Sequence, residues 1–429
     1  MDSRGTRAHD RTGRRPVADG RTVRVDRPAG RDLAAEAFLS WWRRLLADRE
    51  ALTWMAIVAV LYSGATYAIS QLSDWGPDHM MILAVGITRG HFDLSSLTTI
   101  NDIVTIDDRH YQAMSLLPTV PYFVLVPFEA LWPFSRWIVS AVIGIVGAWL
   151  ALPVARRYGP GGPATLWLAT LGGFGTMLFS LSIMGDFYYL AHLECVVLVF
   201  LALIEWRDRR RPWVLGGLIG LAMLARPTLL VAAVPVGLAL LWESRAPLRT
   251  AFAFAWPLAL ALATTGWFDW VRFGSPLETG YDIAWLTPGF EALRAQGLFS
   301  IVHVPTNLAL FIGGGFGIRD TFPWLVPSNA GQSILLTTPA LLIAFNAGLK
   351  DRTNQMLWGG AILAAIPVFL YYGGGGQNTY GYRYAMDFIP FLFPLIAIAA
   401  RERFGNLEKA LIILSVCFVC YGYIWQIYK

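Results

Sequence analysis

Apolar segments long enough to cross a lipid bilayer recur along this chain from residue 52 to the C-terminus. A helix of roughly 20 residues crosses a hydrocarbon core of about 30 Å, and inside that core every backbone polar group must be paired within the segment. Of the 429 residues, 55% are hydrophobic and 15% are charged, which does not suit a soluble chain of this length. The sequence therefore predicts an all-α polytopic membrane protein.

The first 50 residues have a different character, because they are rich in Arg and Asp and poor in apolar residues. Such a segment does not bury a core, so we expect a disordered tail over residues 1–50 and a membrane domain over residues 51–429. Arg14 and Arg15 lie too far before the first apolar segment for a twin-arginine export signal. The basic tail suits contact with anionic membrane lipids, and no motif points to nucleic acid as a partner.

Clusters of positive charge set the expected orientation, since short cytoplasmic loops carry the excess of Lys and Arg. They place the N-terminus and five later clusters in the cytoplasm: Arg156 and Arg157; Arg207 with Arg209 to Arg211; Arg245 and Arg249; Lys350 and Arg352; Arg401 and Arg403. About eleven spans then fit the chain, at residues 52–72, 137–155, 163–181, 187–206, 212–225, 227–243, 250–268, 332–349, 355–373, 384–400 and 407–427. We expect a multi-pass protein of the cytoplasmic membrane.

Residues 117–134 are apolar but rich in Pro and aromatic residues. A full span here would move Arg156 and Arg157 outside, against the charge rule. We therefore expect a juxtamembrane or re-entrant helix at the outer surface, where Trp, Tyr and Phe prefer to lie. A true span that breaks the charge rule once is the alternative.

Two long outer loops follow from this topology, at residues 73–136 and 269–331. Loops longer than about 15 residues between compact elements are usually functional or disordered, and these contain enough aromatic residues to fold. We expect them to form an ordered cap with the chemistry between them. Their polar residues are Asp74, Asp78, His79, His91, Asp93, Asp102, Asp107, Asp108 and His110 in the first loop, and Asp269, Arg272, Glu278, Tyr281, Asp282 and His303 in the second.

Asp78 is the first candidate for a catalytic group, because it lies just beyond the first span on the side assigned to the outside. Membrane enzymes meet lipid-carried substrates at this level. The alternative is a structural one, since Asp also favours the N-cap and first turn of a helix such as the one expected after Asp78.

Several motifs, spread over about residues 70–390, together resemble the bacterial polytopic glycosyltransferases of the GT-C type, the superfamily of protein mannosyltransferases and the lipid A aminoarabinose transferase. The resemblance is carried by the acidic start and amphipathic helix of Asp78–Asp93, His110-Tyr111-Gln112 before Leu117-Pro118, Gly185-Asp186-Phe187, Gly220-Leu221 before Arg226-Pro227, and Tyr380-Gly381-Tyr382-Arg383-Tyr384. The family's acidic pair is replaced here by Asp78 and His79.

The resemblance implies a GT-C-like bundle that transfers a sugar, with inversion, from a polyprenyl-phosphate donor to a hydroxyl of a lipid, glycan or protein acceptor. It makes Asp78 the general base and Asp186 a second acid, with an interfacial helix start as the alternative for Asp186. The substrate-binding residues it implies are His79, Tyr111, Arg226, Tyr382 and Arg383. Guanidinium groups suit a lipid phosphate, although a structural salt bridge, such as one between Arg383 and Asp387, is the alternative reading.

No bound metal is expected, because no carboxylate and histidine cluster has metal-ligand spacing, and Cys195, Cys417 and Cys420 lack a His partner. A divalent cation remains the alternative, since some members of the family need one. His192 and Glu194 lie inside an expected span, where ionisable groups are costly unless they face a wet interior. We expect them to extend the pocket.

Two rival functions remain at the level of sequence. A secondary transporter also places charges inside a helical bundle, although no convincing inverted repeat is visible. A non-catalytic membrane protein that retains a GT-C-like shell would explain the altered acidic pair. Such a protein would tolerate Asp78→Asn, whereas the enzyme would not.

Overall fold

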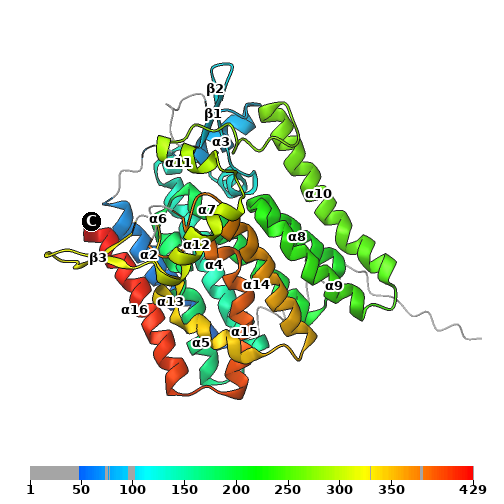
Figure 1. Cartoon of the computed structure of the whole chain (residues 1–429), viewed down its shortest axis with the longest axis vertical. Helices are drawn as coiled ribbons and strands as arrows, with labels where there is room; N and C mark the ends of the chain where they lie inside the picture. Colours follow the sequence, from blue (N-terminus) through cyan, green and yellow to red (C-terminus); the bar gives the residue numbers. More distant parts are fainter. Residues whose placement is uncertain are drawn as a thin grey trace, which may run out of the picture. The chain divides into compact units, whose positions relative to one another are not determined.

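The computed structural model describes residues 48–72, 76, 78–94, 102–328, 330–376 and 380–428. The predicted tail lies outside the described residues as far as residue 47, and Asp74 of the first loop also lies outside them. Residues 53–429 form one compact unit. The described part of this unit is mostly helical, with two short hairpins (Figure 1).

Six helices in the described part of the chain are long and apolar enough to cross a membrane. A seventh span is formed if α5 (Pro163–Phe174) and α6 (Met177–Met184), which are bent by 42°, are counted as one. The chain therefore has the make-up of an all-α membrane protein, but the expected count of about eleven spans is not confirmed. The six are α2 (Arg49–Ser70), α4 (Ser135–Tyr158, preceded by Glu129–Phe134), α7 (Phe187–Asp208), α10 (Pro247–Phe273), α14 (Arg352–Leu370) and α16 (Asn406–Tyr428).

The other expected spans are helical but short or broken. They correspond to α8 (Pro212–Ala225), to η3 (Pro227–Ala232) with α9 (Ala233–Glu243), to α13 (Ile334–Thr337) with η5 (Pro339–Ala347), and to η6 (Arg383–Asp387) with α15 (Ile389–Glu402). Proline explains most of the breaks, because it lacks an N–H and disfavours helical geometry in the residue before it. Pro227 and Pro339 each begin a new element directly after a helix end.

Residues 117–134 form two short 3₁₀ helices rather than one long helix. They are η1 (Leu117–Val124) and η2 (Glu129–Phe134), with Pro121 and Pro133 inside them. Neither is long enough to cross a bilayer by itself. η2 ends at Phe134 and α4 begins at Ser135, so residues 117–134 lead into the membrane-spanning helix α4.

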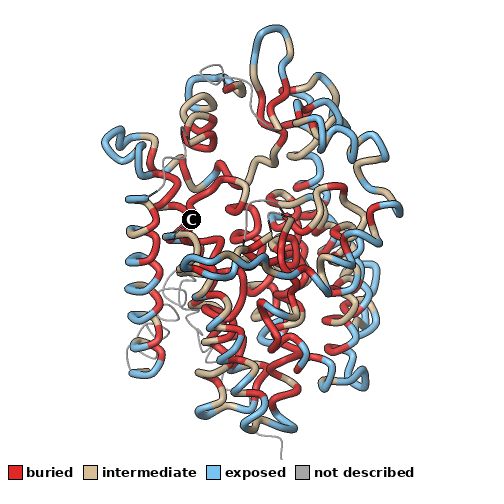
Figure 2. Tube along the Cα trace, turned by 60° about the vertical axis from the view of Figure 1, so that its left-hand side comes forward, coloured by how far each residue is buried: buried red, intermediate tan, exposed pale blue. Residues whose placement is uncertain are grey.

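The helices differ in how much of their apolar surface other parts of the protein cover. In α7, 67% of the most apolar 18-residue window is buried, against 22% in α10 and 28% in α16. Figure 2 shows the same contrast, with buried chain concentrated in the interior and exposed chain at the periphery. Large apolar side chains on α10, including Leu248, Phe252 and Leu260, are exposed, which is the pattern of a lipid-facing helix.

Parts of the two long loops fold together into one structure, which we call the cap and define as residues 78–94, 102–134 and 274–300. Its elements are α3 (His79–Thr88), the antiparallel hairpin of β1 (Ile103–Ile106) and β2 (Arg109–Gln112), η1, η2 and α11 (Pro288–Arg294). Trp285 of the second loop exchanges backbone hydrogen bonds with the first loop, accepting from Asp102 at 3.0 Å and donating to Ile103 at 2.8 Å. Figure 1 shows α3, β1, β2 and α11 gathered at one end of the bundle.

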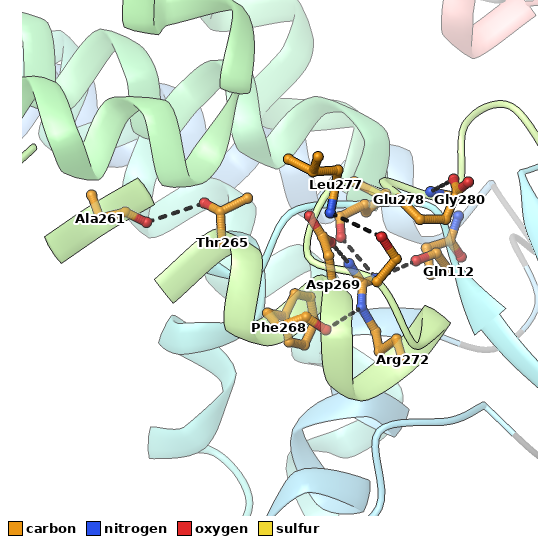
Figure 3. Close-up of polar contacts among 11 residues, drawn as sticks. Gln112, Ala261, Thr265, Phe268, Asp269, Arg272, Leu277, Glu278 and Gly280 are labelled. Atoms are coloured by element: carbon orange, nitrogen blue, oxygen red, sulfur yellow. Dashed lines mark hydrogen bonds and ion pairs between the residues drawn. The ribbon is translucent and has the colours of Figure 1, made fainter. Parts of the chain in front are cut away.

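Arg272, near the end of α10, fastens the second loop to the first (Figure 3). Its Nη1 donates to the carbonyl oxygens of Gln112 at 2.6 Å and Met114 at 3.1 Å, and its Nη2 pairs with Oδ1 of Asp269 at 2.7 Å. Its Nε donates to the carbonyl of Phe268, and the guanidinium carbon lies 3.7 Å from the centre of that ring. We call the pair of Arg272 and Asp269 the cap clamp.

The rest of the second loop lies against the end of α14. It contains η4 (Ile301–His303), α12 (Val304–Gly313) and a hairpin of β3 (Phe316–Ile318) and β4 (Leu325–Pro327). The side-chain amide of Asn307 donates to the carbonyls of Phe369 and Tyr371, at 2.8 Å each. These bonds satisfy two of the carbonyl groups left without a helical partner at the end of α14.

Candidate functional site

A cavity of about 240 Å³ lies between the cap and the helices. Its walls come from segments far apart in the sequence, so only the tertiary structure assembles it. They include the residues that flank the β1–β2 hairpin, the second loop of the cap, α7, the junction of α8 with η3, the end of α14, and η6. The polar side chains in its lining are Asp102, Ser115, Tyr188, His192, Arg226, Thr228, Thr279, Tyr281, Tyr371, Arg383 and Tyr384.

Arg226 reaches the cavity because α8 ends at this residue. It precedes Pro227 and adopts extended backbone angles, φ −140° and ψ 106°, as the residue before a proline prefers. Its Nε lies 2.7 Å from Oδ1 of Asp387, and its side chain is 19% exposed whereas that of Asp387 is fully buried. Arg226 is thus the member of the pair that a ligand in the cavity can contact.

Arg383 lines the same cavity from η6. Its Nη2 donates to the hydroxyl of Tyr384 at 3.2 Å, and its guanidinium carbon lies 5.3 Å from the ring centre of Tyr189 and 5.0 Å from that of Tyr384. Arg226 lies 5.2 Å from the same Tyr384 ring, so both guanidinium groups are close to one tyrosine. The two arginines predicted as substrate-binding residues are therefore brought together.

The backbone of Gly376 makes room for Arg383. A Cβ at this position would clash with the Arg383 side chain, and φ is +93°, a conformation that other residues rarely adopt. At the end of this run of four glycines, the backbone therefore lies close against the side chain of Arg383.

Asp102 is the acid in the cavity lining, and it comes from the residue directly before β1. Burial raises the pKa of its carboxyl above the usual 3.8, while a hydrogen bond from Tyr188 and the positive charge of Arg383 act in the opposite direction. A raised pKa makes the protonated form of this acid easier to reach than that of an exposed aspartate. The sequence placed Asp102 in the first loop but gave it no role; the hairpin pattern after it was the available signal.

His192 joins the cavity to a buried polar cluster. Its Nδ1 lies 3.2 Å from Oδ1 of Asp387, and Oδ2 of Asp387 accepts a hydrogen bond from Thr228 at 3.1 Å. Together with Arg226, these residues link α7, the start of η3 and η6. The prediction that His192 extends the pocket agrees with its place in the lining. Glu194, the other residue of that prediction, is buried but does not line this cavity.

Asp78 lies outside the cavity lining and holds three elements together. Its Oδ1 accepts a hydrogen bond from the backbone N–H of Met80 at 3.1 Å, which makes it the N-cap of α3. Its Oδ2 accepts from the hydroxyl of Ser135 at 2.7 Å, and Tyr122 of η1 is a further hydrogen-bond partner. The N-cap alternative is thus what the structure shows for its carboxylate, and its role as a base stays a prediction.

His79 follows Asp78 and is also outside the cavity lining. Its Nδ1 lies 2.7 Å from Oε1 of Gln112, and its ring stacks on Phe187 with the ring centres 4.4 Å apart. Burial lowers the pKa of the imidazole, which favours its neutral form. His79 therefore joins α3 to the cap hairpin and to the start of α7.

Asp186 caps the start of α7, as Asp78 caps the start of α3. Its Oδ1 accepts from the backbone N–H of Tyr188 at 3.0 Å, so it is the N-cap of that helix. Burial raises the pKa of its carboxyl. Asp186 does not line the cavity, but it fixes the turn that places Tyr188 there.

The two tyrosines predicted as substrate contacts are packed into the protein. Tyr111 of β2 belongs to a buried cluster in the cap with Val104 and Ala284. Tyr382 is fully buried, and its hydroxyl donates to the carbonyl of Asn307 at 3.4 Å. Neither residue is part of the cavity lining in this structure.

The arrangement in the cavity suits an anionic ligand that also carries an apolar or hydroxyl-rich part. Two arginines supply positive charge, four tyrosines supply ring faces and hydroxyls, and Asp102 and His192 supply groups that exchange protons. Among the described residues, no group of three or more His, Cys, Asp or Glu side chains is placed to hold a metal ion. No family model, curated protein or solved structure matches this chain.

Proposed function

We propose that this chain is a GT-C-like glycosyltransferase that moves a sugar from a polyprenyl-phosphate donor to an acceptor hydroxyl. The observation that carries the proposal is the joint presence of Arg226 and Arg383 in one cavity of a membrane protein. Guanidinium groups form charge-assisted, paired hydrogen bonds with phosphate oxygens. Charged side chains in such a protein are costly, so two of them beside one cavity favour a binding function.

The remaining lining supports a sugar and a lipid chain at the same place. Tyr188, Tyr281 and Tyr371 offer ring faces on which a sugar can stack and hydroxyls that can bond to it. Leu298 and Val368 offer apolar surface for the first part of the lipid. The acceptor, a lipid, a glycan or a protein, then meets the sugar from the opposite side.

The reaction proposed is a single displacement with inversion. The acceptor oxygen attacks the anomeric carbon while the bond from that carbon to the phosphate oxygen breaks, and the arginines stabilise the departing phosphate. The resemblance assigns Asp78 as general base and Asp186 as a second acid, and both assignments stay predictions. Asp78 would need to exchange its bond to Ser135 for one to the acceptor.

The proposal includes an orientation and a fold. Arg157 pairs with Asp208 at 2.6 Å, and Arg401 donates to the carbonyl of Gly159 at 3.1 Å, so positive clusters that are distant in sequence gather at one end. We assign this end to the cytoplasm, the cap and the active site to the outer face of the cytoplasmic membrane, and about eleven helices to the bundle. Membrane lipids surround it, and no cofactor is needed unless a divalent cation takes part.

The test is transfer from a panel of radiolabelled polyprenyl-phosphate sugars by the purified protein in liposomes that contain a native lipid and glycan extract. We expect transfer by the wild type, a loss of at least tenfold with Arg383→Gln, and no change with Arg109→Gln, which alters an exposed arginine of the cap hairpin. Absence of transfer from every donor by folded wild-type protein would contradict the proposal.

The same assay tests the assignment of the base. Asp78→Asn keeps a side-chain oxygen for capping α3 but removes the basic carboxylate. If Asp78 is the base, transfer disappears while the variant stays folded. Asp107→Asn, in the exposed turn of the cap hairpin, is the matched control.

A further inference from the structure

The two ring nitrogens of His192 have different surroundings. Nδ1 lies 3.2 Å from a carboxylate oxygen of Asp387, and both side chains are fully buried. Asp387 is also paired with Arg226 at 2.7 Å, which favours the ionised carboxylate. A carboxylate only accepts hydrogen bonds, so Nδ1 of His192 carries the proton. Nε2 is then the nitrogen with a lone pair.

Nε2 of His192 is buried and has no hydrogen-bond partner within the described part of the protein. Buried polar groups without a partner are rare in folded proteins, because each costs free energy. His192 lines the cavity next to Arg226, and because Nε2 itself is covered, an acceptor hydroxyl reaches it only when a neighbouring side chain of the lining moves. With Nδ1 occupied by Asp387, Nε2 is the ring atom that remains for that hydroxyl.

We propose that His192, in place of the Asp78 that the resemblance implies, is the general base of the reaction and that Asp387 is its positioning residue. This inference rests on the proposed glycosyl transfer. Nε2 takes the proton of the acceptor hydroxyl, and the acceptor oxygen forms a bond to the anomeric carbon. The bond from that carbon to the phosphate oxygen breaks, and its electron pair leaves with the polyprenyl phosphate. The products are the glycoside, the lipid phosphate and an imidazolium, which later returns its proton to water.

The charges around His192 couple this step to donor binding. The positive charges of Arg226 and Arg383 beside the cavity oppose an imidazolium, whereas the carboxylate of Asp387 favours one. A phosphate bound at the arginines adds negative charge and offsets their effect. His192 is therefore a better base when the donor is bound. The acceptor hydroxyl is then deprotonated only when a sugar is present to receive it. Asp387 accepts a hydrogen bond from Nδ1 of His192 and so fixes the tautomer in which Nε2 has the lone pair.

The experiment separates chemistry from binding by using His192→Gln, with His91→Gln, an exposed histidine of the cap, as its matched control. Transfer is measured as kcat, and binding as the Kd of a short-chain isoprenyl phosphate. We expect kcat to fall by about 10²–10⁴-fold with His192→Gln, the usual range for loss of a general base, while Kd changes less than about threefold. The control should match the wild type.

A second measurement on the wild-type protein does not depend on any variant remaining folded. Nitrogen-15 NMR of histidine-labelled protein should show His192 protonated at Nδ1 and unprotonated at Nε2, and Asp387→Asn should lower kcat and shift this tautomer. A proton on Nε2 instead of Nδ1 would overturn the inference.

The kinetic outcomes also distinguish the two proposals. Transfer by the wild type with an unchanged kcat in His192→Gln leaves the glycosyltransferase proposal standing and overturns only the role of His192. If Asp78→Asn abolishes transfer while His192→Gln does not, the base is Asp78. No transfer by the wild type overturns both proposals together.

Discussion

Two buried ion pairs of the same chemistry occupy different parts of this protein. In the cap clamp, Arg272 and Asp269 are 2.7 Å apart with side chains 2% and 6% exposed. At the cavity, Arg226 and Asp387 are also 2.7 Å apart, but Arg226 is 19% exposed and faces the cavity. In the clamp, Arg272 donates to three backbone carbonyls and a carboxylate, whereas Arg226 meets Asp387 through Nε and also lines the cavity.

The difference separates structure from function. A buried pair whose hydrogen bonds are all made inside the protein holds elements together and offers nothing to a ligand. A pair of which one member reaches a cavity can bind an external anion. The sequence does not show whether an Arg and Asp pair at helix ends reaches a cavity, because that depends on which side chains pack around the pair.

The largest effect on stability should come from breaking the clamp. Arg272→Met leaves Asp269 buried without a cation and leaves the carbonyls of Gln112 and Met114 without their donor. We expect the free energy of unfolding to fall by about 3–5 kcal/mol, as is typical when one partner of a buried pair is removed. Denaturant unfolding in detergent measures this. The double variant Asp269→Leu with Arg272→Met should recover part of the loss; a loss under about 1 kcal/mol in the single variant contradicts the role of the clamp.

The same substitution at both pairs should give opposite results. Arg226→Lys keeps a positive charge for Asp387 but loses the planar, forked donor set that suits phosphate. We expect about tenfold weaker binding of a short-chain isoprenyl phosphate, about 1.4 kcal/mol, with little change in stability. Arg272→Lys should lower stability and leave the Kd of the folded protein unchanged. Calorimetric titration and thermal unfolding of both variants test this, and equal loss of binding in the two would remove the distinction.

A smaller effect is expected at Asp78, whose carboxylate belongs structurally with the clamp rather than with the cavity. Asp78→Ala removes the N-cap of α3 and the bond to Ser135, so the free energy of unfolding should fall by about 1 kcal/mol or somewhat more. Asp78→Asn should lose clearly less, because an amide oxygen still caps a helix. Denaturant unfolding of the two variants gives the comparison, and an equal loss in both would show that charge, not capping, matters at this site.

The smallest expected effect is a pH dependence from Asp102 on the cavity side. Burial raises the pKa of its carboxyl in the folded protein above the usual 3.8, so the folded protein favours the protonated acid. This contribution to stability is present below about pH 3.8 and is lost as the pH rises through the folded pKa. As the pH rises above 3.8, the stability of Asp102→Asn should therefore fall less than the stability of the wild type. Thermal unfolding across this range, wild type against variant, tests the sign, and identical profiles would contradict it.

Part of the fold and of the site could be predicted from local sequence. Apolar segments of sufficient length predicted α2, α4, α7, α10, α14 and α16 near their observed bounds, because the bilayer imposes one length on every spanning helix. The Arg226-Pro227 step predicted a charged residue at a helix end, since proline restricts the residue before it. Arg383 lines the cavity, and its contact with substrate stays a prediction.

Other features depend on contacts between distant segments and were not predictable. The sequence offered Asp78 as the acid of the site, but Asp102 lines the cavity, because the pairing of β1 with the second loop decides which acid points inward. The count of about eleven spans came from apolar length and from the positive clusters between the segments, whereas prolines break several of those segments into short helices.

The sequence by itself determined that this protein is helical and apolar, and where its positive charges and proline breaks fall, since these follow from hydropathy and backbone geometry within a few residues. Only the tertiary structure decided which charges meet. His192 and Asp387 are 195 residues apart, and their contact exists because α7 packs against η6. The partner that a buried charge finds depends on how distant helices pack, and no local pattern contains that information.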